Sequence, residues 1–295
     1  MPARKAIITA AIPAVLAIGA YQADRYLQRK LLPAGRDMPH EPIDFGLDAY
    51  EVWMESRLGT ALHGWYVPPA HHGGHAVVVT HGWGANGSLM LPIAARLADE
   101  GFGVLVPDSR GHGFSSKVGE ISLPRFAEDL TDFIDFAFAQ PEVGSVAVLG
   151  HSMGAAASIL VGTRRDDLDA VVAVGAFADP RELMAKAPGM TRLPEALRRA
   201  VFRRMEAAIG ARFDEISPLF VIDRLNSPLM LVQGGEDQVI PLTDFERLGE
   251  AAPPGTRSLL VVDGVHDRLD EYLPHVGAIV AFIHTTVGEG ADASA

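Results

Sequence analysis

The sequence predicts an α/β protein with a mostly parallel sheet of eight strands, helices on both faces of the sheet and a small helical lid. Short, continuous runs of apolar residues recur along the chain, which is typical of strands that are covered on both faces. Amphipathic stretches of helical length separate most of these runs. Residues 181–213 interrupt this alternation with a long stretch that contains no strand pattern, which indicates an insertion.

The strands and helices can be placed in order along the chain. Tyr50 to Arg57 and Leu62 to Val67 alternate in polarity, and Gly59 between them indicates a hairpin. The parallel strands are expected at residues 76–80, 103–106, 146–149, 170–174, 229–232 and 259–262. The helices are expected at residues 89–100, 124–139, 153–163, 243–251 and 269–286. The main domain therefore spans residues 47–287, and residues 288–295 are expected to be a flexible tail.

The inserted segment 181–213 is expected to be the helical lid. Apolar side chains at three- and four-residue steps predict one helical face, made of Leu197, Val201, Met205, Ala208 and Ile209. The segment has eight Arg or Lys and three Glu, a net charge of +5. Its arginines could face anionic lipid, and a solvated helix flank is the alternative.

The amino-terminal segment differs from this domain. Residues 6–23 carry no charge and have cations on both sides, and a helix of this length just spans a hydrocarbon core. We expect residues 1–30 to be a membrane anchor or a signal segment, with the anchor favoured, and residues 31–46 to be a tether. The protein is therefore expected to be membrane-associated, on a side that the flanking cations do not define.

Composition and charge exclude several classes of function. The chain has a net charge of −12, and nucleic-acid binding, which needs a basic face, is therefore not expected. It has no cysteine, which excludes disulfides, thiolate metal sites and a cysteine nucleophile. We expect neither a metal nor a cofactor.

The motif Gly150-His151-Ser152-Met153-Gly154 follows one predicted strand and precedes an alanine-rich helix. A serine in this context lies on a strained strand-to-helix turn, where side chains at the glycine positions would collide with the neighbouring strand and helix. The amino end of the helix then points toward the negative charge that develops on an attacked carbonyl. We predict that Ser152 is a nucleophile and that the backbone N–H of Met153 donates to the oxyanion.

A second oxyanion donor is expected in the loop after strand 76–80, which reads His81-Gly82-Trp83-Gly84-Ala85-Asn86. The glycines allow the backbone to approach a substrate carbonyl, and the N–H of Trp83 is the expected donor. The Trp83 side chain either walls an acyl pocket or packs beneath the loop.

A serine nucleophile needs a base, and the base needs a carboxylate that holds its tautomer. His266 lies between the last predicted strand and the final helix, which is the position expected for the base. Asp237 follows strand 229–232 in Gly234-Gly235-Glu236-Asp237 and is the expected acid. Asp179, after strand 170–174, is the alternative acid position.

The order Ser152, Asp237, His266, with each residue after a strand, resembles the α/β-hydrolase superfamily over residues 47–287. Residues 106–115 resemble that superfamily's loop after the fourth strand, in which Asp108 and Arg110 are expected to brace the loop. Residues 216–218 and the amino terminus resemble bacterial membrane-anchored esterase or peptidase-like members. Dehalogenases of the same fold have an aspartate nucleophile, and Ser152 argues against that reaction.

The expected function is that of a serine hydrolase that cleaves a carboxylic ester through an acyl-enzyme. The same triad serves acyl transfer, thioester cleavage and peptide cleavage, which are the alternatives, together with a binding role without catalysis. The expected partner is a small-molecule or lipid-like acyl ester.

Overall fold

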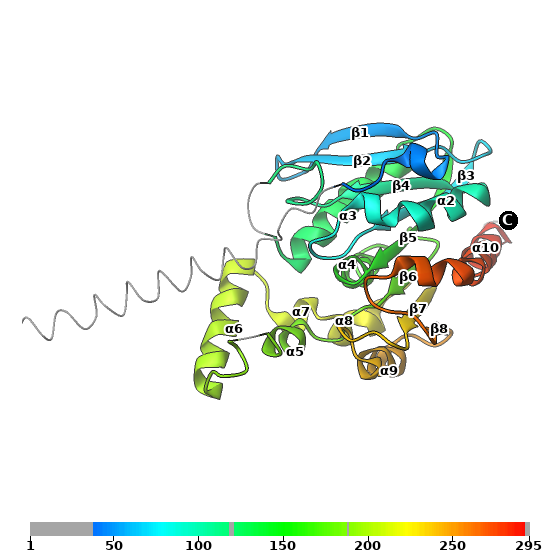
Figure 1. Cartoon of the computed structure of the whole chain (residues 1–295). Helices are drawn as coiled ribbons and strands as arrows, with labels where there is room; N and C mark the ends of the chain where they lie inside the picture. Colours follow the sequence, from blue (N-terminus) through cyan, green and yellow to red (C-terminus); the bar gives the residue numbers. More distant parts are fainter. Residues whose placement is uncertain (1–37, 118–120, 188, 293–295) are drawn as a thin grey trace, which may run out of the picture. The chain divides into compact units, whose positions relative to one another are not determined.

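Eight strands form one sheet in the computed structural model, which describes residues 38–117, 121–187 and 189–292 (Figure 1). Their order across the sheet is β1-β2-β4-β3-β5-β6-β7-β8. The β1–β2 and β2–β4 pairs are antiparallel, and the remaining neighbours are parallel. The strands are β1 Tyr50–Glu55, β2 Ala61–Val67, β3 Gly74–Thr80, β4 Gly103–Asp108, β5 Val143–His151, β6 Val171–Val174, β7 Leu229–Gly234 and β8 Arg257–Val261. The mostly parallel, eight-stranded sheet predicted from the sequence is therefore confirmed.

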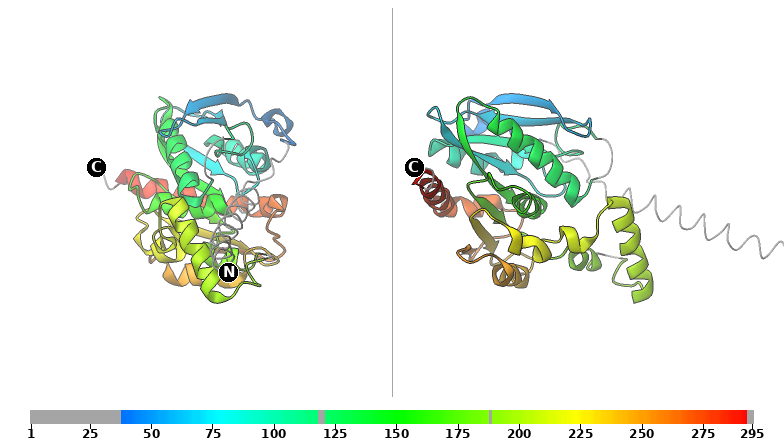
Figure 2. Two further views of the ribbon diagram at one scale, coloured as in Figure 1. Left: turned by 90° about the vertical axis from the view of Figure 1, so that its left-hand side faces the viewer. Right: turned by 180° about the vertical axis from the view of Figure 1, so that it is seen from behind.

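Helices lie on both faces of this sheet (Figures 1 and 2). The α-helices are α2 Leu91–Asp99, α3 Leu123–Phe138, α4 Met153–Gly162, α5 Pro180–Ala185, α6 Glu195–Ile209, α7 Phe213–Ile216, α8 Pro218–Val221, α9 Leu242–Ala251 and α10 Val276–Asp292. Short 3-10 helices are η1 Pro42–Phe45, η2 Gly87–Met90, η3 Ile222–Arg224 and η4 Leu269–His275. The final helix is divided at Pro274, which lacks the N–H that a continuous α-helix requires.

Two hydrophobic cores explain why the central strands are continuously apolar. Val146 and Val148 of β5 pack in the core that contains α3, α4 and α8. Ala147 and Leu149 of the same strand pack in the core on the other face, which contains α2 and α10. Successive side chains of a strand point to opposite faces, so a strand between two helical layers needs apolar residues at every position.

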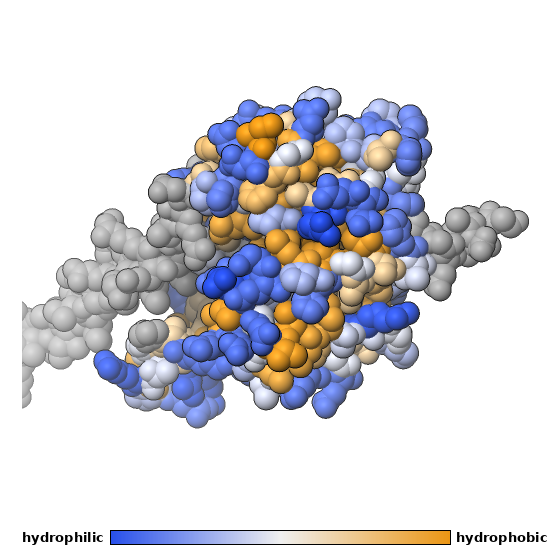
Figure 3. Space-filling model, turned by 45° about the vertical axis from the view of Figure 1, so that its right-hand side comes forward, coloured by the Kyte–Doolittle hydropathy of each residue, from blue (hydrophilic) through white to orange (hydrophobic). Residues whose placement is uncertain are grey.

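Large apolar side chains remain exposed at the two edges of the sheet. Tyr50 and Trp53 on β1 are 62% and 55% exposed, and Leu260 on β8 is 44% exposed. Helices cover only the faces of the sheet, so the edge strands keep more contact with solvent. The surface in Figure 3 is accordingly mixed, with separate hydrophobic patches among mostly hydrophilic residues.

Several boundaries differ from those expected from the sequence. Strand β1 ends at Glu55 because residues after it form a turn, in which the Ser56 hydroxyl accepts the N–H of Thr60 at 3.0 Å. Residues 42–45, placed in the tether, form η1, and Phe45 packs against the core. Helix α10 continues to Asp292, although the flexible tail was expected to begin at residue 288. The glycines in this stretch weaken a helix, but they do not necessarily end it.

The segment expected to be the lid contains α5, α6 and α7. The face of α6 that packs against the core consists of Phe202, Met205 and Ile209. Leu197 and Ala208, which periodicity assigned to this face, are exposed. The spacing of the apolar residues does not show which side of the helix packs on the core. Phe202, whose ring makes a T-shaped contact with the Phe213 ring, turns the packed side toward its own position.

The amino-terminal segment 1–30 lies outside the described residues, as does most of the tether. Within the part of the chain that the structure describes, no helix combines the length and apolar character needed to cross a membrane. The predicted anchor is thus untested.

Candidate active site

Ser152 lies at the junction between β5 and α4, on a turn with φ 56° and ψ −113°. Among the described residues other than glycine, it alone has a positive φ. A side chain at Gly154 would place its Cβ 2.6 Å from the carbonyl oxygen of His81, and one at Gly150 would overlap the Gly154 carbonyl. The two glycines therefore permit the close contacts that surround the turn, as the motif predicts.

Three side chains from separate loops meet at this turn. The His266 Nε2 lies 2.9 Å from the Ser152 hydroxyl oxygen. The other ring nitrogen, Nδ1, lies 2.7 Å from Asp237 Oδ2. An ionised carboxylate only accepts hydrogen bonds, so Nδ1 carries the proton and Nε2 is free to accept the Ser152 hydroxyl hydrogen. The order of contacts is Ser152 to His266 to Asp237.

The Asp237 carboxylate is held by four donors. Its Oδ1 accepts the backbone N–H groups of Val239 and Ile240, each at 2.8 Å. Its Oδ2 accepts the His266 ring and, at 3.2 Å, the side-chain amide of Gln233. Burial by itself raises the pKa of Asp237, but the hydrogen bonds from His266, Ile240 and Val239 lower that pKa below its ordinary value. Asp237 is therefore ionised at neutral pH.

His151 holds the loop that carries His266. Its Nε2 lies 2.8 Å from the backbone carbonyl oxygen of His266, and because a carbonyl only accepts, Nε2 is the donor. The two rings are tilted, with centroids 4.9 Å apart. Burial, followed by the neighbouring His266 ring, lowers the pKa of His151 to about 4. His151 is thus a neutral donor.

From the sequence, His151 was placed within the motif, outside the position of the base, and Gln233 was not singled out. Gln233 was visible as a polar residue at the end of an otherwise apolar strand. Its three amide contacts, to Gly234, Ile240 and Asp237, come from backbone folding that sequence spacing does not show.

The loop after β3 packs directly against Ser152. A Cβ at Gly82 would lie 3.0 Å from Ser152 Cβ, so the backbone that leads to Trp83 passes beside the Ser152 side chain. Met153 is the first residue of α4, and its N–H has no carbonyl partner within the helix. The Trp83 ring stacks on Phe126 with centroids 6.4 Å apart, which supports the packed interpretation of this side chain.

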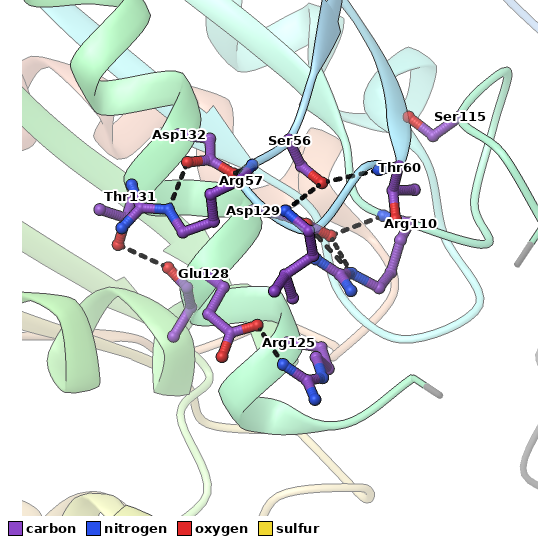
Figure 4. A network of polar contacts seen from close by, with 12 residues as sticks. Ser56, Arg57, Thr60, Arg110, Ser115, Arg125, Glu128, Asp129, Thr131 and Asp132 are labelled. Carbon is purple, nitrogen blue, oxygen red and sulfur yellow. Dashed lines mark hydrogen bonds and ion pairs between the residues drawn. The ribbon is translucent and has the colours of Figure 1, made fainter. Parts of the chain in front are cut away.

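Asp108 and Arg110 brace the surrounding loops. Asp108 accepts the backbone N–H of Gly87 at 2.7 Å and that of Phe114 at 3.0 Å, which ties the loops after β3 and β4 together. Arg110 points at Asp129 on α3, and its Nε lies 3.0 Å from both carboxylate oxygens (Figure 4). Breaking a buried pair of this kind by removing one partner costs about 3–5 kcal/mol.

The alternative acid, Asp179, is committed to another contact. Its carboxylate caps α5 through the N–H of Arg181 and forms an ion pair with the Arg181 side chain at 2.8 Å. It also lies 3.3 Å from the Ser217 hydroxyl. Asp237, not Asp179, is the carboxylate beside His266. In the ranges that the structure describes, no group of His, Asp and Glu side chains is arranged to hold a metal ion.

The fold and the arrangement of Ser152, His266 and Asp237 together define an α/β hydrolase. Comparison with known families agrees: residues 72–218 match the family described as serine aminopeptidase, S33. The chain belongs to the α/β-hydrolase superfamily.

Relatives of similar length come from several bacteria. An uncharacterized protein of Mycobacterium tuberculosis is 29% identical over 246 residues, which cover 82% of this chain and 76% of the relative. The uncharacterized protein YqkD of Bacillus subtilis is 28% identical over 264 residues, which cover 82% of this chain and 84% of the relative.

Solved structures share the fold. The Pyrococcus furiosus esterase Pf2001 superimposes with a TM-score of 0.69 and 21% identity, covering 86% of this chain and 98% of that chain. Est1E from Butyrivibrio proteoclasticus, solved with ferulic acid bound, has a TM-score of 0.65 and 16% identity, covering 80% of this chain and 99% of that chain.

Proposed function

We propose that this protein is a serine hydrolase that cleaves a carboxylic ester through an acyl-enzyme. The observation that carries the proposal is the continuous chain of contacts from Ser152 through His266 to Asp237, at 2.9 and 2.7 Å. The Pyrococcus furiosus esterase Pf2001, which has the same fold, adds support for ester substrates.

The proposed reaction follows from the tautomer of His266, in which Asp237 holds the proton on Nδ1 and leaves Nε2 free to accept one. His266 Nε2 takes the proton from the Ser152 hydroxyl as the oxygen attacks the ester carbonyl. The carbonyl oxygen becomes an oxyanion, which the N–H groups of Met153 and Trp83 stabilise. His266 then gives its proton to the leaving alcohol, and ionised Asp237 stabilises the positive ring throughout. In the second half of the reaction, His266 takes a proton from water as the water attacks the acyl-enzyme. His266 then returns that proton to the Ser152 oxygen as the acid leaves.

Peptide cleavage is a second candidate, because the matched family is described as serine aminopeptidase. An aminopeptidase must bind a free amino group, which calls for a carboxylate that faces the substrate. Asp237 and Asp179 near the triad are both engaged, one with His266 and one with Arg181. Neither of these two carboxylates is therefore left to bind the amino group of a peptide substrate. Acyl transfer and thioester cleavage use the same triad and differ in the acceptor or the leaving group.

The test is turnover of p-nitrophenyl acyl esters, graded by chain length, by the parent protein and by Ser152→Ala. Removing the nucleophile is expected to lower kcat by about 10⁴-fold or more, because the triad acts as a unit. Ser258→Ala, at an exposed position on β8, is the matched serine control and should keep parental activity. A fluorophosphonate probe should label the parent and the control, and leave Ser152→Ala unlabelled.

Aminoacyl p-nitroanilides distinguish the second candidate. Efficient turnover of these amides, whose carbonyl is less reactive than that of an ester, would assign a peptidase, and an added alcohol that outcompetes water would assign a transferase. Undiminished ester turnover by Ser152→Ala would contradict a serine hydrolase of any kind.

A further inference from the structure

Helix α6 has an unusual position for an ordered helix, because none of its residues is buried. Its apolar contacts with the core come from Phe202, Met205 and Ile209, which are partly buried, and its Glu206 accepts the backbone N–H of Phe213 at 2.9 Å. It stands at the margin of the molecule, apart from the sheet, in Figure 1 and in the right-hand view of Figure 2. Most of its circumference is therefore open to solvent.

The outward side of α6 combines apolar and cationic side chains. At 100° per residue, the positions opposite the packed face are Ala196, Ala200 and Ala207, all of which are exposed. Leu197, next to them, is 50% exposed. Arg199 and Arg203 border the strip on one side and Arg204 on the other, and these three are also exposed. A shallow apolar strip between cations allows the helix to lie against an anionic membrane surface, with its arginines at the lipid headgroups.

The charge of this segment is opposite to that of the rest of the chain. Residues 181–213 contain eight Arg or Lys and three Glu, so they carry +5, while the whole chain carries −12. The remaining residues therefore sum to −17. An anionic surface attracts the α6 segment and repels the protein as a whole, which favours orientations in which α6 faces the membrane.

We propose that the outward face of α6 is a docking surface for anionic phospholipid membranes. The insertion that carries α6 leaves the sheet after β6, at the same edge as the triad. Gly175 lies there, and a Cβ on it would be 3.5 Å from the His266 ring. Docking through α6 thus brings this edge toward the lipid headgroups. Together with the proposed function, on which this step rests, it makes an ester in an anionic membrane the substrate class.

The absence of cysteine allows a direct test in the full chain. Ala200→Cys places one thiol on the outward face of α6, where an NBD fluorophore reports burial in lipid. Glu100→Cys, exposed at the end of α2, is the matched label position. Both are made in Ser152→Ala, so that hydrolysis does not alter the vesicles. Vesicles of phosphatidylcholine alone are compared with vesicles that contain phosphatidylglycerol, at low and high salt.

The expected result is a blue shift and a rise in NBD emission at position 200 on anionic vesicles only, with no change at position 100 and with reversal by salt. In the labelled protein, Arg199→Gln with Arg203→Gln is expected to weaken vesicle binding roughly 30-fold, about 1 kcal/mol for each arginine. Arg96→Gln with Arg257→Gln removes two exposed charges elsewhere and should leave binding unchanged.

Three outcomes would overturn the proposal: no shift at position 200, an equal shift on uncharged vesicles, or an equal change on adding duplex DNA, which would assign a general polyanion site. Turnover of a water-soluble ester by the parent protein is measured in parallel. Vesicle binding without turnover would overturn the proposed function and leave the docking surface standing. Turnover without vesicle binding would overturn the docking surface and leave the proposed function standing.

Discussion

The Ser152 backbone is held in a conformation that few residues adopt. A positive φ at a residue with a side chain costs on the order of 1–3 kcal/mol, and the surrounding structure must offset it. The N–H of Ser152 donates to the carbonyl of Val174 at 2.8 Å, which anchors the turn to β6. The sequence predicted this turn because the glycines and the strand-to-helix context are local features.

The contacts among Ser152, His266 and Asp237 were also anticipated from the sequence, because each residue follows a parallel strand and the ends of such strands meet at one edge. The donors that hold the triad were not anticipated. His151 and Gln233 reach it through loop conformations that depend on the whole edge, and spacing along the chain does not encode these.

His151 is expected to position His266 for the proposed reaction. His151→Phe removes the N–H that donates to the His266 carbonyl at 2.8 Å, so the base loses a constraint on its loop. We expect kcat to fall roughly 10- to 100-fold, the effect of a small misplacement of a catalytic group, with little change in KM. His151→Gln keeps an uncharged donor and should recover most of the lost kcat.

Steady-state kinetics on a soluble ester separate the two variants, and thermal unfolding confirms that both are folded. Equal losses of kcat in His151→Phe and His151→Gln, or a change in KM alone, would show that the hydrogen bond from His151 does not position His266 and that the side chain only fills space.

At the scale of elements, apolar periodicity predicted the strands well because burial on both faces leaves a clear pattern. It placed the contact face of α6 incorrectly because a marginal helix has no buried side chain to fix the pattern. It also gave no sign that Phe45 packs on the core. Such packing depends on which surface the folded sheet presents.

Two glycines in helices offer a matched comparison. A Cβ at Gly154, in α4, would lie 2.6 Å from the His81 carbonyl oxygen and 2.7 Å from that of Thr80. Gly154→Ala is therefore expected to destabilise the protein by about 1–3 kcal/mol through overpacking, and to distort the turn at Ser152. Gly249, in α9, has no atom within 4 Å of its Cβ position, so Gly249→Ala should stabilise by about 0.5–1 kcal/mol.

Urea unfolding at pH 7.5 measures the free energy of unfolding of both variants. An ester assay shows whether Gly154→Ala distorts the turn at Ser152. If Gly154→Ala were as stable and active as the parent protein, the close approach of the β3 loop to α4 would not exist in solution.

At the scale of the whole molecule, three buried histidines link the loops around the site to acid stability. His81 donates to the Gly82 carbonyl at 2.7 Å and accepts the N–H of Ser109 at 3.1 Å. His112 donates to the Arg110 carbonyl at 2.9 Å and accepts the N–H of Gly84 at 3.0 Å. The rings of His81 and His112 each use one nitrogen as a donor and the other as an acceptor, which requires the neutral form.

Burial lowers the pKa of each of these rings. The pKa of His81 is lowered, that of His112 is lowered to about 3 with a further contribution from His81, and that of His151 is lowered to about 4. In the unfolded chain a histidine binds a proton below about pH 6.5. Between that pH and the folded pKa, the unfolded state holds more protons, so the stability that is present at neutral pH is lost as the pH falls.

His112→Gln is expected to make the protein less sensitive to acid. Glutamine keeps an uncharged donor and an acceptor for Arg110 and Gly84, but it binds no proton on unfolding. Each neutral buried histidine steepens the loss of unfolding free energy by about 1.4 kcal/mol per pH unit below pH 6.5. Urea unfolding at several pH values between 7.5 and 5 should show a shallower slope for His112→Gln by that amount. All other titrating groups are common to both proteins, so equal slopes would mean that His112 is already charged in the folded state.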